Sequence, residues 1–259
     1  MSSNVFIRKA VFVALALTTP VWADVPELLD DAVQNFLRDS ERWAYTQTVV
    51  QKDAKGKIQK QAVVRYDPSK PYAEQYAPLL IDGAKPSAAD LEEYRHKGEK
   101  LGRRAEKLEK QGTDRFRKSL GELMDLASAK VAEQSAANVT FEVPLKKEDN
   151  HRFPPEKFRV LARVGKETRA FERIEVKLRE PMRTALVLKI KAGEGSLDFS
   201  KVNPEFSPAP VAARGSGSAS ILLVPLGRDY EVKREDFKRV KPYSDRFGVQ
   251  IGTMKALDF

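Results

Sequence analysis

The sequence predicts an α+β fold dominated by antiparallel strands: a strongly curved, half-open β-barrel of about ten strands, covered by an N-terminal helix and a helical insert after strand three. The first observation is a period of two from Thr168 to Glu180, where even positions are mostly apolar and odd positions mostly charged. Such alternation is typical of a half-buried strand. After Pro181 the same parity continues from Met182 to Lys191. The second observation is that helical periodicity is confined to two stretches, near the start and after the third strand.

The two predicted strands, Thr168–Glu180 and Met182–Lys191, share an apolar side and a basic side. The side predicted to face inward carries Ala170, Ile174, Val176, Leu178, Met182, Leu186, Leu188 and Ile190. The opposite side carries Arg169, Arg173, Lys177, Arg179, Arg183, Lys189 and Lys191. Because each exposed apolar side chain forgoes roughly 1.5 to 3 kcal/mol, something must cover the apolar side. The order of the elements favours one curved sheet wrapped around helices over two stacked sheets.

Residues 1–23 have the pattern of a secretory signal peptide. Arg8 and Lys9 precede an apolar run over residues 10–17, and Val21, Trp22 and Ala23 form a small-x-small cleavage site. An uncleaved anchor would need about 20 apolar residues, more than twice this run. We therefore expect cleavage after Ala23, a single domain over residues 24–259, and a periplasmic location.

The composition narrows the function classes. Loss of the signal takes the formal net charge from +9 to +7, because the segment carries two basic and no acidic residues. The chain has no Cys, which excludes disulfides, a thiolate metal site, a Cys nucleophile and an acylated N-terminal Cys. The basic excess suits an anionic membrane, other envelope material or an acidic protein, and does not suggest nucleic acid for an exported chain. The alternative is a solubilising surface.

Helical spacing of apolar residues predicts an opening amphipathic helix over Asp24–Ser40. Two β-branched and aromatic runs, Trp43–Asp53 and Ile58–Tyr66, are joined by a short Gly-containing loop and predict a β-hairpin. A third strand is predicted over Tyr72–Ile81, after a Pro-rich turn.

A helical insert is predicted over about residues 87–136. Ser87 with Asp90 resembles a capping box, and a charged helix with a narrow apolar stripe follows from about Ala88 to Lys110. Two glycines weaken its middle by roughly 1 kcal/mol each. Its pattern fits a lid across the sheet or an ordinary surface helix. A second helix is predicted from Ser119, with apolar residues as far as Val131.

The remaining segments predict a β-meander. Strands are expected over 138–147, 158–164, 168–180, 182–191, 197–202, 218–226, 229–233, 236–241 and 247–251. Gly193, Glu194 and Gly195 are predicted to form a turn, and the Pro, Ala, Gly and Ser residues of 206–217 a loop.

Several segments together resemble the periplasmic lipoprotein-carrier superfamily (LolA, LolB and the N-terminal part of RseB). They are the signal, the opening helix, the first strand WAYTQT at Trp43–Thr48 with its KGK loop, the insert after strand three, and the long meander. The phrases RYDPSKPYAEQ at Arg65–Gln75 and YSDRFGVQIGTMKALDF at Tyr243–Phe259 are similar to uncharacterised relatives. The resemblance covers residues 24–259. It implies a concave apolar cavity under helical lids that holds acyl chains.

No motif indicates catalysis. His96 and His151 have no second His or Cys at helical spacing, no nucleophile elbow surrounds a Ser, and no phosphate-binding loop precedes a helix. We therefore expect no enzyme activity, no cofactor and no metal. The candidate cavity lining consists of Trp43, Tyr45, Tyr66, Tyr76, Phe141, Ile174, Val176, Leu186, Leu188 and Ile190. Plain core is the alternative for each.

The sequence thus predicts a carrier or binding protein for a lipoprotein acyl chain or another hydrophobic envelope ligand, with a role in lipoprotein transport and outer-membrane biogenesis. The alternative is a structural or regulatory interaction protein that uses the basic sheet face and has no ligand cavity. The cargo and the oligomeric state stay open.

Overall fold

The computed structural model describes residues 25–40, 42–110, 123–146, 154–184, 188–221 and 224–246. The expected signal peptide, residues 1–23, and the last strand candidate, 247–251, lie outside the described residues. In the described ranges, no helix combines the length and the apolar character needed to cross a membrane.

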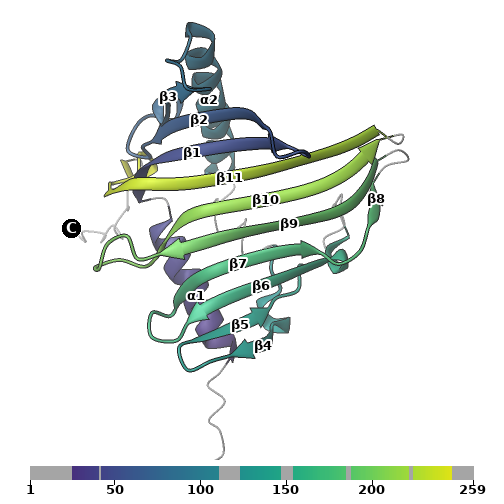
Figure 1. The fold of residues 1–259 in the computed structure, drawn as a ribbon. Helices are drawn as coiled ribbons and strands as arrows, with labels where there is room; N and C mark the ends of the chain where they lie inside the picture. The colour runs from purple at the N-terminus through teal and green to yellow at the C-terminus, as the bar shows by residue number, and fades with distance from the viewer. Residues whose placement is uncertain are drawn as a thin grey trace, which may run out of the picture.

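One eleven-stranded antiparallel sheet forms the body of the molecule, and its strand order is β3-β2-β1-β11-β10-β9-β7-β6-β5-β4, with β8 paired to β9. The sheet is strongly curved and open, with β3 and β4 at its two ends (Figure 1). The predicted fold class is therefore confirmed. The strands are β1 (Trp43–Asp53), β2 (Ile58–Tyr66), β3 (Tyr76–Ile81), β4 (Lys130–Gln134), β5 (Asn138–Glu142), β6 (Phe158–Gly165), β7 (Ala170–Leu178), β8 (Met182–Thr184), β9 (Leu188–Ser200), β10 (Ala209–Ile221) and β11 (Val224–Arg239).

Helix α1 (Val25–Asp39) packs on the sheet near β6 and β7, as the amphipathic pattern predicts. Leu29, Ala32 and Val33 are buried there. They join a core cluster that also contains Val139, Phe141, Val143, Val160, Ala162, Val164, Phe171 and Ile174 from the sheet and the residue after β5. The face of the sheet that carries α1 is called the helix-side face below, and the opposite face the outer face.

The predicted parity holds in β7, with one exception. Ile174 and Leu178 are buried, whereas Lys177 is exposed. Phe171, expected on the charged side, lies in the core instead. The reason is a register irregularity opposite β6, which pairs Phe171 and Arg173 with consecutive residues and leaves Glu172 without a cross-strand partner. Such a bulge reverses the side on which the following residues lie.

Helix α2 (Ala88–Lys110) has the predicted bounds and the predicted capping box. The Ser87 amide donates to Asp90 Oδ2 at 2.9 Å, and the Asp90 amide donates to Ser87 Oγ at 3.2 Å. The helix sits beside β3 and the 3₁₀ turn Tyr72–Glu74, at one end of the sheet (Figure 1). These are its main contacts, so α2 is seated at the sheet edge and does not lie across the middle strands.

The two glycines of α2 have a packing role that the sequence did not indicate. A Cβ built on Gly98 would lie 2.1 Å from the Tyr72 carbonyl oxygen, and one on Gly102 would lie 2.7 Å from three Tyr72 side-chain atoms. Their absent side chains therefore form the notch that receives Tyr72.

The extent of the helical insert, predicted as about 87–136, is wrong. From Leu126 to Ser128 the chain forms one 3₁₀ turn, and β4 follows from Lys130. The apolar residues read as a helical stripe include Val131, which pairs instead with Phe141 of β5. Cross-strand pairing with a buried strand outweighs the weak helical pattern here.

Several predictions about the meander are also wrong. The predicted strand 218–226 is divided between β10 and β11, and the strands predicted over 229–233 and 236–241 both belong to β11 or its end. The segment 182–191 is not one strand, because β8 and β9 pair with each other as antiparallel strands. Its parity survives, since the pairs Met182–Ile190 and Thr184–Leu188 each share a face. Residues 193–195 form no turn, and residues 209–217 form no loop; both segments lie inside the long strands β9 and β10.

Candidate functional site

Four of the predicted lining residues belong to an aromatic ladder that crosses one end of the sheet. The ring centroids of Tyr45 and Tyr66 are 5.1 Å apart, and those of Tyr66 and Tyr76 are 4.8 Å apart. Phe237 of β11 continues the ladder, 5.5 Å from Tyr45 and 6.1 Å from Trp43. The rings therefore pack against one another.

Two arginines close the ladder. The Arg234 guanidinium lies 4.9 Å from the Tyr45 ring centre, and that of Arg239 lies 5.0 Å from the Trp43 ring. Arg239 also forms an ion pair with Asp39 at the end of α1, whose side chain is only 7% exposed. Burial raises the pKa of the Tyr45 phenol, against the opposing effect of Arg234. The ladder is thus tied to the helix that covers the rest of the core.

The predicted aliphatic lining residues divide between the core and the middle of the sheet. Phe141 and Ile174 are buried in the cluster beneath α1, with 0% and 8% exposure. Val176 is only partly buried and pairs with Gly195.

Ile190, near the start of β9, is also partly buried and pairs with the buried Met182 of β8. Leu186 and the side chain of Leu188 lie outside the described residues. Cavity lining by the ten residues of the set stays a prediction.

Between the ladder and the core, the helix-side face of β9 and β10 is paved with glycine. Gly195 pairs with Gly215, and Gly193 with Gly217, so four glycines lie in two facing pairs. Their side follows from the register, because Gly195 pairs with Val176, two residues from the core residue Ile174. We call these four residues the glycine floor.

The space above the glycine floor holds no described side chain at contact distance. A Cβ built on Gly193 meets nothing within 4 Å. At Gly195, Gly215 and Gly217 the nearest atoms are backbone carbonyl oxygens, at 3.4 to 3.9 Å. The floor is continued by partly buried small and aliphatic residues: Leu197, Ala213, Val232 and Val49.

Sequence reasoning missed the floor, although it leaves a signal. Both segments carry glycines at every second position, with Glu194 between the first pair and Ser216 between the second. A spacing of two places all four on one side of a strand. Turns do not require glycine at every second position, so this spacing distinguishes a strand with one face of glycines from a loop.

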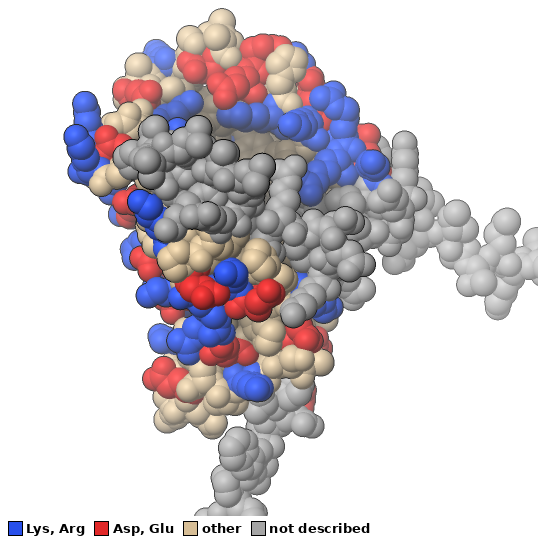
Figure 2. All heavy atoms as spheres, turned by 90° about the vertical axis from the view of Figure 1, so that its right-hand side faces the viewer, with Lys and Arg blue, Asp and Glu red and all other residues tan. Residues whose placement is uncertain are grey.

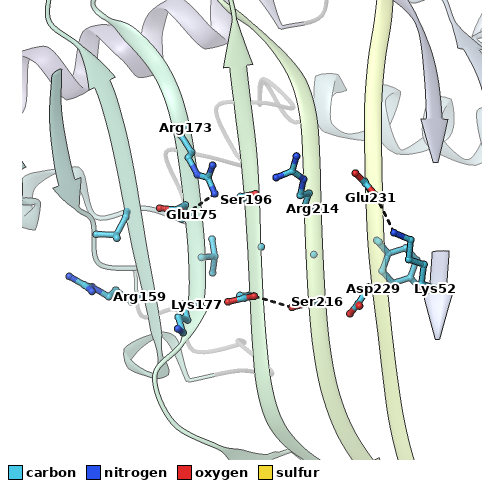
Figure 3. A pocket seen from close by; sticks show the side chains of 16 residues that line it. Lys52, Arg159, Arg173, Glu175, Lys177, Ser196, Arg214, Ser216, Asp229 and Glu231 are labelled. Carbon is cyan, nitrogen blue, oxygen red and sulfur yellow. Dashed lines mark hydrogen bonds and ion pairs between the residues drawn. The ribbon is translucent and has the colours of Figure 1, made fainter. Parts of the chain in front are cut away.

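The outer face of the same strands is hollowed and charged. A hollow of about 640 Å³ lies over β6, β7, β9, β10, β11 and β1. Lysine, arginine and acidic side chains surround it, with two serines between them (Figure 3). Its charged members are Lys52, Arg159, Arg173, Lys177, Arg214, Glu175, Glu194, Asp229 and Glu231.

Acidic neighbours pair with many basic residues of the outer face. Arg173 contacts Glu175 at 2.9 Å and Asp198 at 3.1 Å, and Lys52 contacts Glu231 at 3.4 Å. Figure 2 likewise shows blue and red atoms interspersed over the lower part of the molecule. The outer face is therefore mixed in charge, rather than a single basic patch.

Two other residues of the predicted basic set also have acidic partners. Arg169 pairs with Glu27 and Asp31 of α1, and Arg179 donates to Glu142 at 2.5 Å. The side chains of Arg183 and Lys189 lie outside the described residues.

Comparison with solved structures finds related folds at low sequence identity. The chain is similar in fold to a LolA superfamily protein. That protein, from Nitrosomonas europaea, is 8% identical, with a TM-score of 0.40 over 87% of this chain and 97% of the other. A DUF1329 family protein from Desulfovibrio piger is 10% identical, with a TM-score of 0.35 over 83% and 92% of the two chains. No protein-family model matches the sequence, and no curated protein does.

The first of these structures comes from the superfamily that the sequence resembles. At these TM-scores the likeness concerns the fold and carries no argument about a ligand, so the chemistry must be read from the site. Within the described ranges, no three His, Asp or Glu side chains are grouped to hold a metal ion. What the site offers is an apolar strip of backbone and small side chains on one face, and mixed charge on the other.

Proposed function

We propose that this chain is a non-enzymatic carrier or binding protein that holds an apolar ligand, such as the acyl chain of a lipid or lipoprotein, on the glycine floor. The observation that carries the proposal is the strip above Gly193 and its three partners, between the aromatic ladder and the core under α1, where no described side chain lies within 4 Å of a Cβ built on any of the four glycines. We further propose that the protein acts in the periplasm after export, because of its signal-like N-terminal segment.

The energetics of glycine in strands support this reading. A glycine inside a strand destabilises it by roughly 0.5 to 1 kcal/mol relative to Ala, so four cost about 2 to 4 kcal/mol. Strand glycines mark bends, bulges and places where a ligand or another backbone approaches closely. An acyl chain bound there would recover free energy at about 0.8 kcal/mol for each buried CH₂ group.

Filling the strip tests the proposal. Gly193→Leu adds a side chain into open space on the helix-side face. Ala192→Leu is the matched control, because the adjacent residue points to the outer face and is exposed. Leu suits a strand at least as well as Gly, so both variants should fold.

The readout is displacement of a fluorescent fatty-acid probe from the full chain by unlabelled fatty acid. We expect Gly193→Leu to weaken probe binding about tenfold, since a loss of about 1.4 kcal/mol corresponds to a factor of ten. Ala192→Leu should bind like the wild type. Equal binding by both variants, or no probe binding by the wild type, would contradict a ligand on the floor; the second result would favour a protein without a ligand cavity.

A further inference from the structure

One stretch of α2 differs from the charge-balanced surface of the sheet. Its second half carries five basic residues, and we call four of them, Lys100, Arg103, Arg104 and Lys107, the basic stripe. All four are exposed. None forms an ion pair with a described acidic side chain, in contrast to Arg95 and Lys97 one to two turns earlier, which pair with Glu92, Glu93 and Glu99.

The spacing of the basic stripe places it on one side of the helix. Its positions follow the pattern i, i+3, i+4, i+7, which aligns side chains along a single helical face. From Lys100 to Lys107 the stripe extends about 10.5 Å along the axis, at 1.5 Å per residue.

The stripe points away from the body of the protein. Gly98 and Gly102 form the side of α2 that rests on Tyr72. Lys100 lies two residues from each of them, and two residues turn a helix by about 200°. The seating of α2 on Tyr72 therefore fixes the basic stripe in the direction of solvent. Near the top of Figure 2, at the height of α2 in Figure 1, blue lysine and arginine atoms lie beside a red group of acidic atoms.

We infer that the basic stripe docks the protein on a membrane surface that contains anionic phospholipid. Four like charges spread along one face of an exposed helix match a plane of many anionic head groups better than a single small ligand. The choice of a membrane over an acidic protein rests on the proposed function, because bilayers are the source and the destination of the acyl chains that such a carrier would hold.

The size of the effect follows from the number of charges. A Lys or Arg near an anionic membrane contributes roughly fivefold to the binding constant, so four contribute on the order of several hundredfold. Salt weakens this attraction, since charges are screened beyond about 10 Å at 0.1 M ionic strength.

The test is co-sedimentation of the full chain with vesicles of phosphatidylcholine, with and without phosphatidylglycerol. The first variant replaces the stripe: K100Q/R103Q/R104Q/K107Q. Gln is a good helix former, so α2 should persist. The control, K191Q/K201Q/K233Q/K238Q, removes the same four units of charge from exposed positions elsewhere in the chain.

We expect the wild type to bind only the anionic vesicles, the stripe variant to lose at least a hundredfold in binding, and the control to stay within about fivefold of the wild type. The inference is overturned if the control loses as much as the stripe variant, if the stripe variant binds like the wild type, or if the wild type does not bind anionic vesicles. Binding to an acidic protein without binding to vesicles would likewise overturn it.

The result of the vesicle experiment can be distinguished from the result of the fatty-acid probe experiment on the glycine floor. The stripe variant should bind the fatty-acid probe in solution as the wild type does. Vesicle binding that depends on the stripe, in a protein that binds no probe, would sink the carrier proposal and leave the docking surface standing.

Discussion

Gly98→Ala is a substitution for which helix propensity and packing predict opposite results. In an isolated helix, Ala is more favourable than Gly by about 1 kcal/mol. In the folded protein, the new Cβ would lie 2.1 Å from the Tyr72 carbonyl oxygen and 3.1 Å from Ala73 Cα. Since contacts below 3.0 Å essentially do not occur for a real Cβ, α2 must move out by about 0.9 Å or more. The obstacle is backbone, so no side-chain rotation relieves it.

Overpacking of this kind costs typically 1 to 3 kcal/mol, and a rigid obstacle places Gly98→Ala toward the upper part of that range. After the propensity gain, we expect the docked state of α2 to lose about 1 to 2 kcal/mol. Hydrogen exchange should therefore become roughly five- to thirtyfold faster across residues 88–107, with smaller changes in β6 and β7. Lys100→Ala on the opposite side of the helix is the control, and should change little.

A second substitution identifies the obstacle. Gly102→Ala would place its Cβ 2.7 Å from Cβ, Cγ and Cδ2 of Tyr72, so the clash is with a side chain. Combination with Tyr72→Gly, which removes all three of these atoms, should rescue Gly102→Ala but not Gly98→Ala, after correction for the loss caused by Tyr72→Gly alone. Slower exchange in Gly98→Ala, at the rate that helix propensity alone predicts, would refute the seating of α2 on Tyr72.

Two further predictions concern the sheet. Ile174→Ala should lower the free energy of unfolding, measured in urea, by about 2 to 5 kcal/mol, because Ile174 is 8% exposed and lies in the core beneath α1. The control, Lys177→Ala at an exposed position, should change it by no more than about 0.5 kcal/mol. Similar losses in both variants would show that the two faces of β7 are assigned wrongly. The Glu142 carboxylate accepts hydrogen bonds from Arg179 and Arg159, and these lower its pKa below the ordinary 4.5. A carboxyl whose pKa is depressed on folding stabilises the protein above its unfolded pKa and loses that contribution as the pH falls through the folded value. Stability measured from neutral pH downward should thus decline below about pH 4.5 less steeply in Glu142→Gln than in the wild type, and identical acid limbs would contradict the shift.

The local hydrophobic pattern was enough to predict the elements in which the apolar residues of the pattern are also the buried residues. The alternation around Ile174 and Lys177 assigned both faces of β7, and the spacing of Leu29, Ala32 and Val33 assigned the buried side of α1. In each case the side chains that define the pattern are also those that contact the core, so a rule about sequence is a rule about packing.

The candidate site was not predictable in the same way, because its defining residues have no side chains. Rules for single sequences read glycine as a break, on account of its conformational freedom. At Gly193, Gly195, Gly215 and Gly217 the backbone is extended strand, and the absence of side chains leaves room above it. The aromatic ladder was predicted as a set of residues, but not as a stack, because Phe237 reaches Tyr45 only through a pairing between distant parts of the chain.

That pairing constrains how the molecule can assemble. β1 lies between its hairpin partner β2 and β11, which is the last described strand along the chain. Val50 of β1 therefore pairs with Glu231, which is distant in sequence. Only β11 connects the first three strands to the other strands of the sheet order. A chain that ended before Val224 would hold two separate pieces of sheet, connected through α1 on β6 and β7, and their pairing must wait for β11. Contacts of such long sequence separation slow folding, because the loop must close before they contribute. The exposed edges of both pieces in the interval are the kind of surface on which strands aggregate, so rapid arrival of β11 protects the whole sheet.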